Sequence, residues 1–137
     1  MSWVVDTCVI IDVLEDASEH NGVSVALLKR LAPDGLLLCP VSFVELAPAF
    51  EGDIKRQCDF LDETGIRYKL TAWLMKDTYC AHAAWYRQVA ARRAGVAPRR
   101  PMADILIGAF AMRHDGLVTR NPSDFADIFP SLAIRVP

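Results

Sequence analysis

Residues 3–12 read Trp3-Val4-Val5-Asp6-Thr7-Cys8-Val9-Ile10-Ile11-Asp12, and this stretch decides how the rest of the chain is interpreted. Its first three residues are β-prone and predict a short strand that Asp6 ends. Thr7 is a favourable N-cap residue for an apolar helix over residues 8–14. In a parallel α/β sheet, ligands bind at the carboxyl ends of the strands. Asp6 is therefore expected at the mouth of a cleft, although helping to cap the helix would by itself explain an acid here.

The size and composition of the chain indicate one globular domain. It has 137 residues, of which 53% are hydrophobic, and its glycine and proline content is ordinary. A single domain over residues 1–137 is therefore expected. No apolar run reaches the length that spans a bilayer, and the first strand follows Met1 too closely for a signal peptide. We expect a soluble, cytoplasmic protein with no membrane association.

The cysteines and the net charge argue against two classes of protein. Cys8, Cys39, Cys58 and Cys80 form no Cys-x-x-Cys pair, so free thiols are expected rather than disulfides or a zinc site. The formal net charge is −2, which provides no general attraction to nucleic acid. Any binding of nucleic acid must then come from a local group of basic side chains.

Strand and helix patterns alternate along the chain. The predicted strands are residues 3–5, 36–39, 66–70, 117–119 and 133–136, the last of them at an edge. The predicted helices are residues 8–14, 24–31, 41–47, 53–64, 71–94 and 102–112, with a short helix around Phe125. This order predicts an α/β fold with a central parallel sheet of four or five strands and helices on both faces.

Inward-facing stripes can be assigned in two of these helices. In the helix over residues 53–64 the stripe is Ile54, Cys58 and Leu61, and Gly65 is well placed to end that helix. In the helix over residues 71–94 the stripe is Leu74, Ala81, Trp85 and Val89. We interpret this second stripe as core rather than as a platform on which bases stack.

Four acidic residues stand at the predicted carboxyl edge of the sheet. They are Asp6 after the first strand, Glu45 in the helix after the second, Asp104 in the first turn of the most apolar helix, and Asp124 after the fourth strand. Each has a simpler explanation, because helix starts favour acids, and Ser42 and Glu45 have the spacing of a capping box. Together, however, four carboxylates repel one another, and a divalent cation relieves that repulsion. Oxygen ligands without Cys or His favour Mg²⁺ or Mn²⁺ over zinc.

Four stretches carry a family resemblance. They are Val4-Val5-Asp6-Thr7-Cys8-Val9-Ile10-Ile11-Asp12, Val41-Ser42-Phe43-Val44-Glu45-Leu46, Met102-Ala103-Asp104-Ile105-Leu106-Ile107-Gly108-Ala109 and Leu117-Val118-Thr119-Arg120-Asn121-Pro122-Ser123-Asp124-Phe125. They resemble the four motifs of the PIN domain, with most similarity to VapC-type toxins of bacterial toxin–antitoxin pairs. The resemblance implies a PIN-like three-layer α/β/α fold and a ribonuclease that uses Mg²⁺, for which Mn²⁺ can substitute. It also implies a homodimer and a small antitoxin partner.

The resemblance further implies which residues form the active site. The implied catalytic residues are Asp6, Glu45, Asp104, Asp124, Thr119 and Asn121, with the four acids as metal ligands. The fourth acid is the least certain match, because many relatives carry an acid where this chain has Asn121. We favour Asp124 as the ligand. Thr119 and Asn121 are then expected to orient water or the groups that hold the ligands.

Binding of RNA by this chain would depend on a few arginines. The candidates for phosphate contacts are Arg92, Arg93, Arg99, Arg100, Arg113 and Arg120, with ordinary surface solvation as the alternative. Two other functions stay open, namely a housekeeping RNA-processing nuclease with the same site and a PIN-like module that binds without cutting. The short chain favours the toxin. The full set of acids argues against the binding module, because a protein that only binds phosphates gains nothing from carboxylates.

Overall fold

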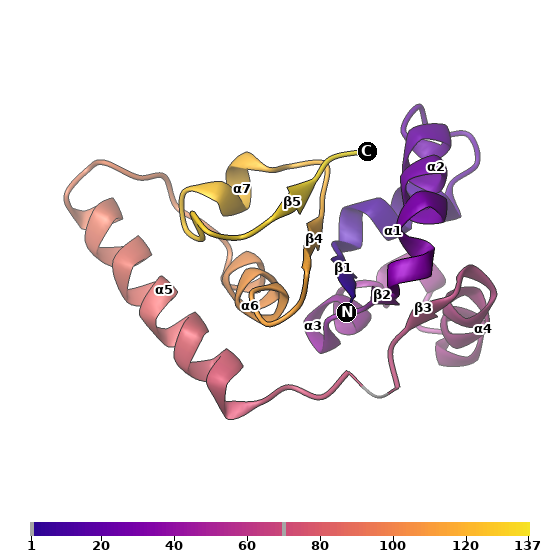
Figure 1. The fold of residues 1–137 in the computed structure, drawn as a ribbon, viewed down its shortest axis with the longest axis horizontal. Helices are drawn as coiled ribbons and strands as arrows, with labels where there is room; N and C mark the ends of the chain where they lie inside the picture. Colours follow the sequence, from indigo (N-terminus) through magenta and orange to yellow (C-terminus); the bar gives the residue numbers. More distant parts are fainter. Residues whose placement is uncertain (1, 70) are drawn as a thin grey trace.

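The computed structural model describes residues 2–69 and 71–137 (Figure 1). The strands are β1 Trp3–Val5, β2 Leu36–Leu37, β3 Ile66–Arg67, β4 Gly116–Val118 and β5 Ile134–Arg135. The helices are α1 Thr7–Leu14, α2 Asn21–Leu31, α3 Pro40–Glu45, α4 Ile54–Thr64, α5 Met75–Arg93, α6 Met102–Ala111 and α7 Ser123–Ala126, with 3₁₀ turns η1 Ala32–Asp34 and η2 Pro48–Phe50. The expected order of strands and helices is confirmed.

The five strands form one parallel sheet in the order β3-β2-β1-β4-β5. From β1 at the centre, the chain builds outward through β2 and β3 and then returns to build β4 and β5 on the other side. Such a reversal leaves a crevice beyond the carboxyl ends of the two strands where it occurs, here β1 and β4. The parallel sheet and the edge position of the last strand are both confirmed.

Helices cover both faces of the sheet, which gives three layers. In Figure 1, α5 and α6 lie on one side of the strands and α1, α2 and α4 on the other. Alternate strand residues face opposite layers, because successive side chains of a strand point to opposite faces. Val4 and Leu117 thus pack with α5 and α6, whereas Val5 and Val118 pack with α1, α2 and α4. The strands β1, β2 and β4 are therefore buried on both faces, as the apolar runs of the second and fourth strands predicted, whereas β3 and β5 at the edges are partly exposed.

Helix α3 starts and ends differently from the prediction. It begins at Pro40, and proline is favourable at this first position because a backbone N–H there would have no partner within the helix. The N-cap residue Cys39 makes no capping hydrogen bond from its side chain. The capping box expected from Ser42 and Glu45 is therefore wrong, because Glu45 is the last residue of the helix. Pro48 does end this helical region, since it opens the separate turn η2.

Three helix predictions on the surface need correction. Leu74, expected in the inward stripe of the helix over residues 71–94, is 39% exposed and stands just before α5. Ile54 is 68% exposed at the first position of α4 and does not face inward, whereas Leu61 is buried. Gly65 ends α4 with φ 74°, as expected. Helix α5 begins at Met75 rather than at residue 71, because the Asp77 carboxylate accepts the Leu74 N–H at 2.8 Å and fixes the start there.

Several strand and composition predictions can also be compared with the structure. Strands β2, β3 and β5 are each shorter than expected, whereas β4 has the expected length and starts one residue earlier. Leu70, the predicted end of the third strand, lies outside the described residues. The cysteines are free thiols, as expected. Within residues 2–69 and 71–137, no helix is both long enough and apolar enough to cross a membrane.

Candidate active site

Asp6 lies at the carboxyl end of β1 and is only 7% exposed. It is the N-cap of α1, and its Oδ1 accepts the Thr7 N–H at 2.8 Å, so the predicted cap Thr7 is instead the first helical residue. Its Oδ2 accepts the Thr119 hydroxyl at 2.8 Å and the Cys8 thiol at 3.5 Å. Burial raises the pKa of Asp6 above its ordinary value, although these three hydrogen bonds lower it. Asp6 is therefore a firmly positioned carboxylate in an environment that disfavours its charge.

Asp104 lies in the first turn of α6, as predicted. Burial, together with the negative charges of Asp6, Asp124 and Glu45, raises its pKa to about 6, against an opposing effect of Arg100. Among the described residues, no basic side chain forms an ion pair with Asp104. Of the four acids expected to converge, the other three thus all act on the charge of Asp104.

The other two acids are each held by a neighbour. Glu45 is exposed at the end of α3, and its Oε1 accepts the Thr7 hydroxyl at 2.8 Å. Asp124 forms a 2.6 Å ion pair with Arg100. The side chain of Asp124 makes no capping hydrogen bond to α7, whose N-cap residue is Pro122, so the simpler explanation as a helix cap does not apply. Glu45 and Asp124 are therefore each already engaged by another side chain, Glu45 by Thr7 and Asp124 by Arg100.

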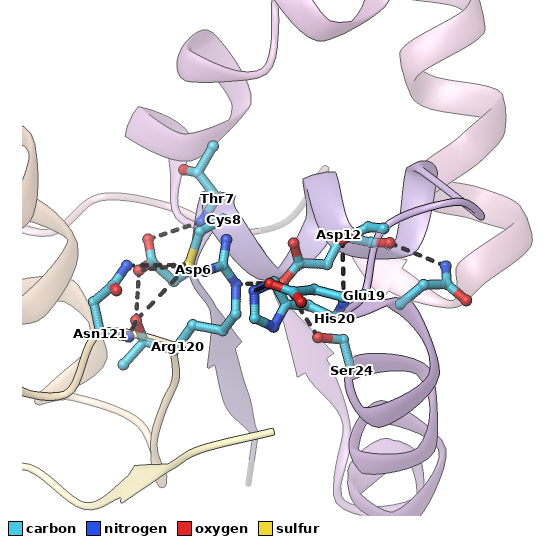
Figure 2. A network of polar contacts seen from close by, with 12 residues as sticks. Asp6, Thr7, Cys8, Asp12, Glu19, His20, Ser24, Arg120 and Asn121 are labelled. Atoms are coloured by element: carbon cyan, nitrogen blue, oxygen red, sulfur yellow. Dashed lines mark hydrogen bonds and ion pairs between the residues drawn. The ribbon is translucent and has the colours of Figure 1, made fainter.

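Thr119 and Asn121 link β4 to Asp6, and Figure 2 shows Asn121 close to Cys8 and Asp6. The buried Thr119 hydroxyl donates to Asp6 and accepts the Asn121 backbone N–H at 3.1 Å. The Asn121 amide lies 3.9 Å from the Cys8 sulfur. The strand-end hydroxyl therefore fixes the orientation of Asp6, and Asn121 is exposed at the rim beside it.

The donor atoms of this site fit a hard divalent cation in their chemistry. Carboxylate oxygens are the ligands that Mg²⁺ and Mn²⁺ prefer. The pKa of Asp6 is raised mainly by burial, and that of Asp104 by burial and by the charges of three other acids. In residues 2–69 and 71–137, however, no three acidic, histidine or cysteine side chains stand close enough together to form a ready-made metal site. The contacts of Glu45 with Thr7 and of Asp124 with Arg100 account for part of this spacing.

The candidate arginines are distributed unevenly around these acids. Arg100 is at the site through its pair with Asp124, and Arg92, Arg93 and Arg99 are exposed on α5 and the loop that follows. Two others are placed in structural contacts. Arg120 forms a 2.6 Å ion pair with Asp12, as seen in Figure 2. Arg113, which follows the C-terminal end of α6, opposite to the end that carries Asp104, forms a 2.9 Å ion pair with Asp77.

The network around Asp12 was not anticipated from the sequence. Asp12 lies on α1 and is buried, its Oδ2 accepts from Arg120, and the Ser24 hydroxyl of α2 lies 3.4 Å from the same oxygen. This network ties two helices to the loop that carries Thr119 and Asn121. A signal was present, because Asp12 is an acid on the inner side of a helix that is otherwise almost wholly apolar.

Comparisons with known proteins agree with this geometry. The family model of the PIN domain matches residues 3–128, while no curated protein matches the chain. A solved structure described as VapBC2 from Rickettsia felis, bound to a DNA fragment from their promoter, contains a chain with a similar fold. The TM-score is 0.72 at 17% sequence identity, covering 100% of this chain and 99% of that one. Because the family model spans most of the chain and the fold agrees with it, the chain belongs to the PIN domain family.

Proposed function

We propose that this chain is a metal-dependent ribonuclease that acts in the cytoplasm as the toxin of a type II toxin–antitoxin pair. The observation that carries the proposal is Asp104, whose pKa is raised to about 6 by burial and by three neighbouring acids while no cation pairs with it among the described residues. Membership of the PIN family supports nuclease activity. The fold similarity to a chain of VapBC2 supports the toxin role.

Four acids would hold the cation, namely Asp6, Asp104, Glu45 and Asp124. When bound, Mg²⁺ or Mn²⁺ supplies a Lewis acid that activates water and stabilises the leaving oxygen of a phosphodiester. Asp6 is best prepared for this role, because three hydrogen bonds already fix its two oxygens. Glu45 and Asp124 would exchange their present contacts for the cation.

The remaining residues of the site would position groups rather than hold the cation. Thr119 keeps Asp6 in one orientation through its hydroxyl. Asn121, exposed at the rim, offers an amide that can orient water next to the phosphodiester. Arg100 pairs with a carboxylate of the site and could instead pair with a phosphate oxygen, because a guanidinium binds either group in a bidentate manner.

Cleavage of RNA by the purified protein tests this proposal. We expect Mg²⁺ or Mn²⁺ to support cleavage of a structured RNA and EDTA to stop it. Asp6→Asn and Asp104→Asn should each lower the rate by at least about 100-fold, while the melting temperature in EDTA stays equal or rises because repulsion is relieved. Asp59→Asn, which alters an exposed acid on α4, is the matched control. Full activity in both active-site variants would refute the proposal.

The partner of a toxin would have to cover this site. An apolar groove of about 610 Å³ lies beside it, lined by Val41, Val44, Trp73, Ala81, Trp85 and Leu106 among others. Two residues that line the groove are close in sequence to the acids, because Val44 directly precedes Glu45 and Met102 is two residues before Asp104. An antitoxin segment with apolar side chains followed by an arginine would be complementary to both parts.

Two observations on partners would separate the toxin from a housekeeping nuclease. We expect a neighbouring reading frame to encode a small protein that binds and silences this one, and light scattering to show a homodimer. Sequencing of RNA ends after brief expression of wild type and Asp6→Asn would then identify the RNA that is cut. If no such inhibitor exists, a housekeeping RNA-processing role is the better explanation. If the purified protein binds RNA but does not cut it, the chain is instead a PIN-like module that only binds.

A further inference from the structure

A hollow of about 600 Å³ lies beside the acids, between the end of α5 and the start of α6. We call it the arginine–tryptophan hollow, and its lining residues are Trp85, Arg92, Arg99, Arg100, Pro101 and Met102. Trp85 and Arg92 are seven residues apart and therefore share one face of α5. None of the described residues that line the hollow is acidic, although the chain as a whole carries a net charge of −2. Three basic side chains therefore gather here without an acidic one, in a chain that is slightly acidic as a whole.

The three arginines differ in how their charge is balanced. Arg100 is mostly buried, pairs with Asp124 at 2.6 Å and donates to the Ser123 carbonyl at 3.1 Å. Arg92 and Arg99 are exposed, and within the described part of the chain neither pairs with an acid. The hollow therefore holds two uncompensated positive charges and joins the acid cluster through the third.

Trp85 gives the hollow a flat apolar surface. Its indole packs partly against the core formed by α5 and α6, which agrees with the core position expected for it. The side chain is only half-buried, however, and its remaining surface lines the hollow. Every nucleic-acid base has a π face that stacks on an aromatic side chain, and such stacking is independent of sequence.

We propose that the arginine–tryptophan hollow binds an unpaired nucleotide next to the cleaved bond, an inference that rests on the ribonuclease function proposed above. Arg92 and Arg99 bind the phosphate oxygens and Trp85 stacks the base. The base must be unpaired, because a base within a duplex offers no free face to stack. An acidic protein segment could also pair with the arginines, but it would leave the indole without a matching group. The combination of two free arginines and an indole therefore favours RNA.

Binding of a short RNA without cleavage tests this inference. The probes are fluorescently labelled nine-nucleotide oligouridylate and oligoadenylate, measured by anisotropy with full-length protein in EDTA at several KCl concentrations. Arg92→Gln combined with Arg99→Gln should weaken binding and flatten the slope of log affinity against log salt by roughly 1.4, since each phosphate contact to a single strand contributes about 0.7. Trp85→Leu should weaken binding about tenfold without changing that slope, and Trp85→Phe should restore most of it.

Matched controls lie on the same helix, α5. Lys76→Gln and Tyr86→Leu change an exposed lysine and an exposed tyrosine that do not line the hollow, and both should bind like wild type. Unchanged binding in the double arginine variant would overturn the inference, as would equal losses in the controls or tighter binding of poly-glutamate than of RNA at this hollow. If the double arginine variant still cleaves RNA and binds it like wild type, only the proposed role of the hollow is refuted. If binding depends on the hollow but wild type does not cleave RNA in Mg²⁺, only the proposed nuclease activity is refuted.

Discussion

The two ends of α6 place carboxylates in opposite electrostatic conditions. At the N-terminal end, Asp104 faces three other acids, forms no ion pair among the described residues, and has a pKa raised to about 6 by burial and their charge. Beyond the C-terminal end, Arg113 forms two hydrogen bonds of 2.9 Å with Asp77, which is 1% exposed. Burial raises the pKa of Asp77, but Arg113 and the Leu74 N–H more than offset this, so that the pKa falls below its ordinary value.

This difference separates an acid that holds the fold together from one that is available for binding. Asp77 is buried and Asp104 is partly buried, and burial raises the pKa of both, so burial does not explain why their pKa values shift in opposite directions. The partner does, because a guanidinium that neutralises Asp77 leaves that carboxylate nothing further to bind. Asp104 retains unbalanced charge, and a cation or a protonated form is the only way to relieve it. The following predictions break or sharpen this contrast.

The largest expected effect is on stability, at the Asp77 end. Asp77→Asn should lower the free energy of unfolding by about 3 kcal/mol, because it breaks a buried ion pair and leaves Arg113 without its partner. RNA cleavage per folded molecule should not change. Urea unfolding measures the loss, and Asp59→Asn, whose pair with Lys55 is exposed, should stay within about 0.5 kcal/mol of wild type. Equal stability of the two variants would contradict a structural role for Asp77.

A smaller change of opposite sign is expected at the Asp104 end. Because the pKa rises from 3.8 to about 6 on folding, the native state binds more protons than the unfolded state between these values, and stability falls as pH rises through this window. Asp104→Asn removes the penalty. In EDTA the variant should be more stable than wild type by about 1 kcal/mol above pH 6, after allowance for solvent screening.

The pH profile is what identifies this effect. The advantage of Asp104→Asn should shrink as pH falls from about 6 and vanish only below 3.8, where the wild-type carboxyl is protonated in both states. The Asp77 contribution behaves in the opposite way, since a lowered pKa gives stability that is present above the ordinary value and is lost only in stronger acid. An advantage of Asp104→Asn that is independent of pH would show that the acids do not repel one another as inferred.

The smallest effect is expected from releasing Asp124. Arg100→Gln should lower the Mg²⁺ concentration that gives half-maximal cleavage by about threefold, because Arg100 no longer competes with the cation for Asp124. A threefold change corresponds to the free energy of a partly exposed ion pair. The same change in an Asp124→Asn background should have no such effect. If Arg100→Gln acts equally in both backgrounds, Asp124 is not the carboxylate that binds the cation, and Asn121 becomes the candidate for the fourth position.

The sequence predicted the order of elements and the convergence of the acids, because both follow from local patterns. Strands such as Leu36–Leu37 are apolar on both faces, and the carboxyl ends of parallel strands share one edge whatever the details. Contacts between distant residues could not be predicted in this way. The pairing of Arg120 with Asp12 spans 108 positions, and only the folded chain shows that this arginine is not free for phosphate.

The errors have physical causes of the same kind. Thr7 is a good cap in isolation, but the carboxylate of Asp6 takes that role, and the Thr7 hydroxyl is then free to hold Glu45. The capping box of Ser42 and Glu45 fails because Pro40 starts its helix earlier. Trp85 was expected in the core and is there in part, yet the loop containing Arg99 leaves part of its surface beside a hollow. In each case another residue, adjacent or distant in the sequence, changes which of several local options is used.

Mg²⁺-dependent melting of wild type and Asp104→Asn at pH 7 tests most directly whether the unpaired acids form a cation site. A cation that binds only the folded state adds about 1.4 kcal/mol at ten times its dissociation constant, which for a chain of this size raises the melting temperature by about 5 °C. We expect this rise in wild type and in the Asp59→Asn control, and none in Asp104→Asn. A wild-type protein that is indifferent to Mg²⁺ and Mn²⁺, or an equal rise in Asp104→Asn, would contradict the cation site.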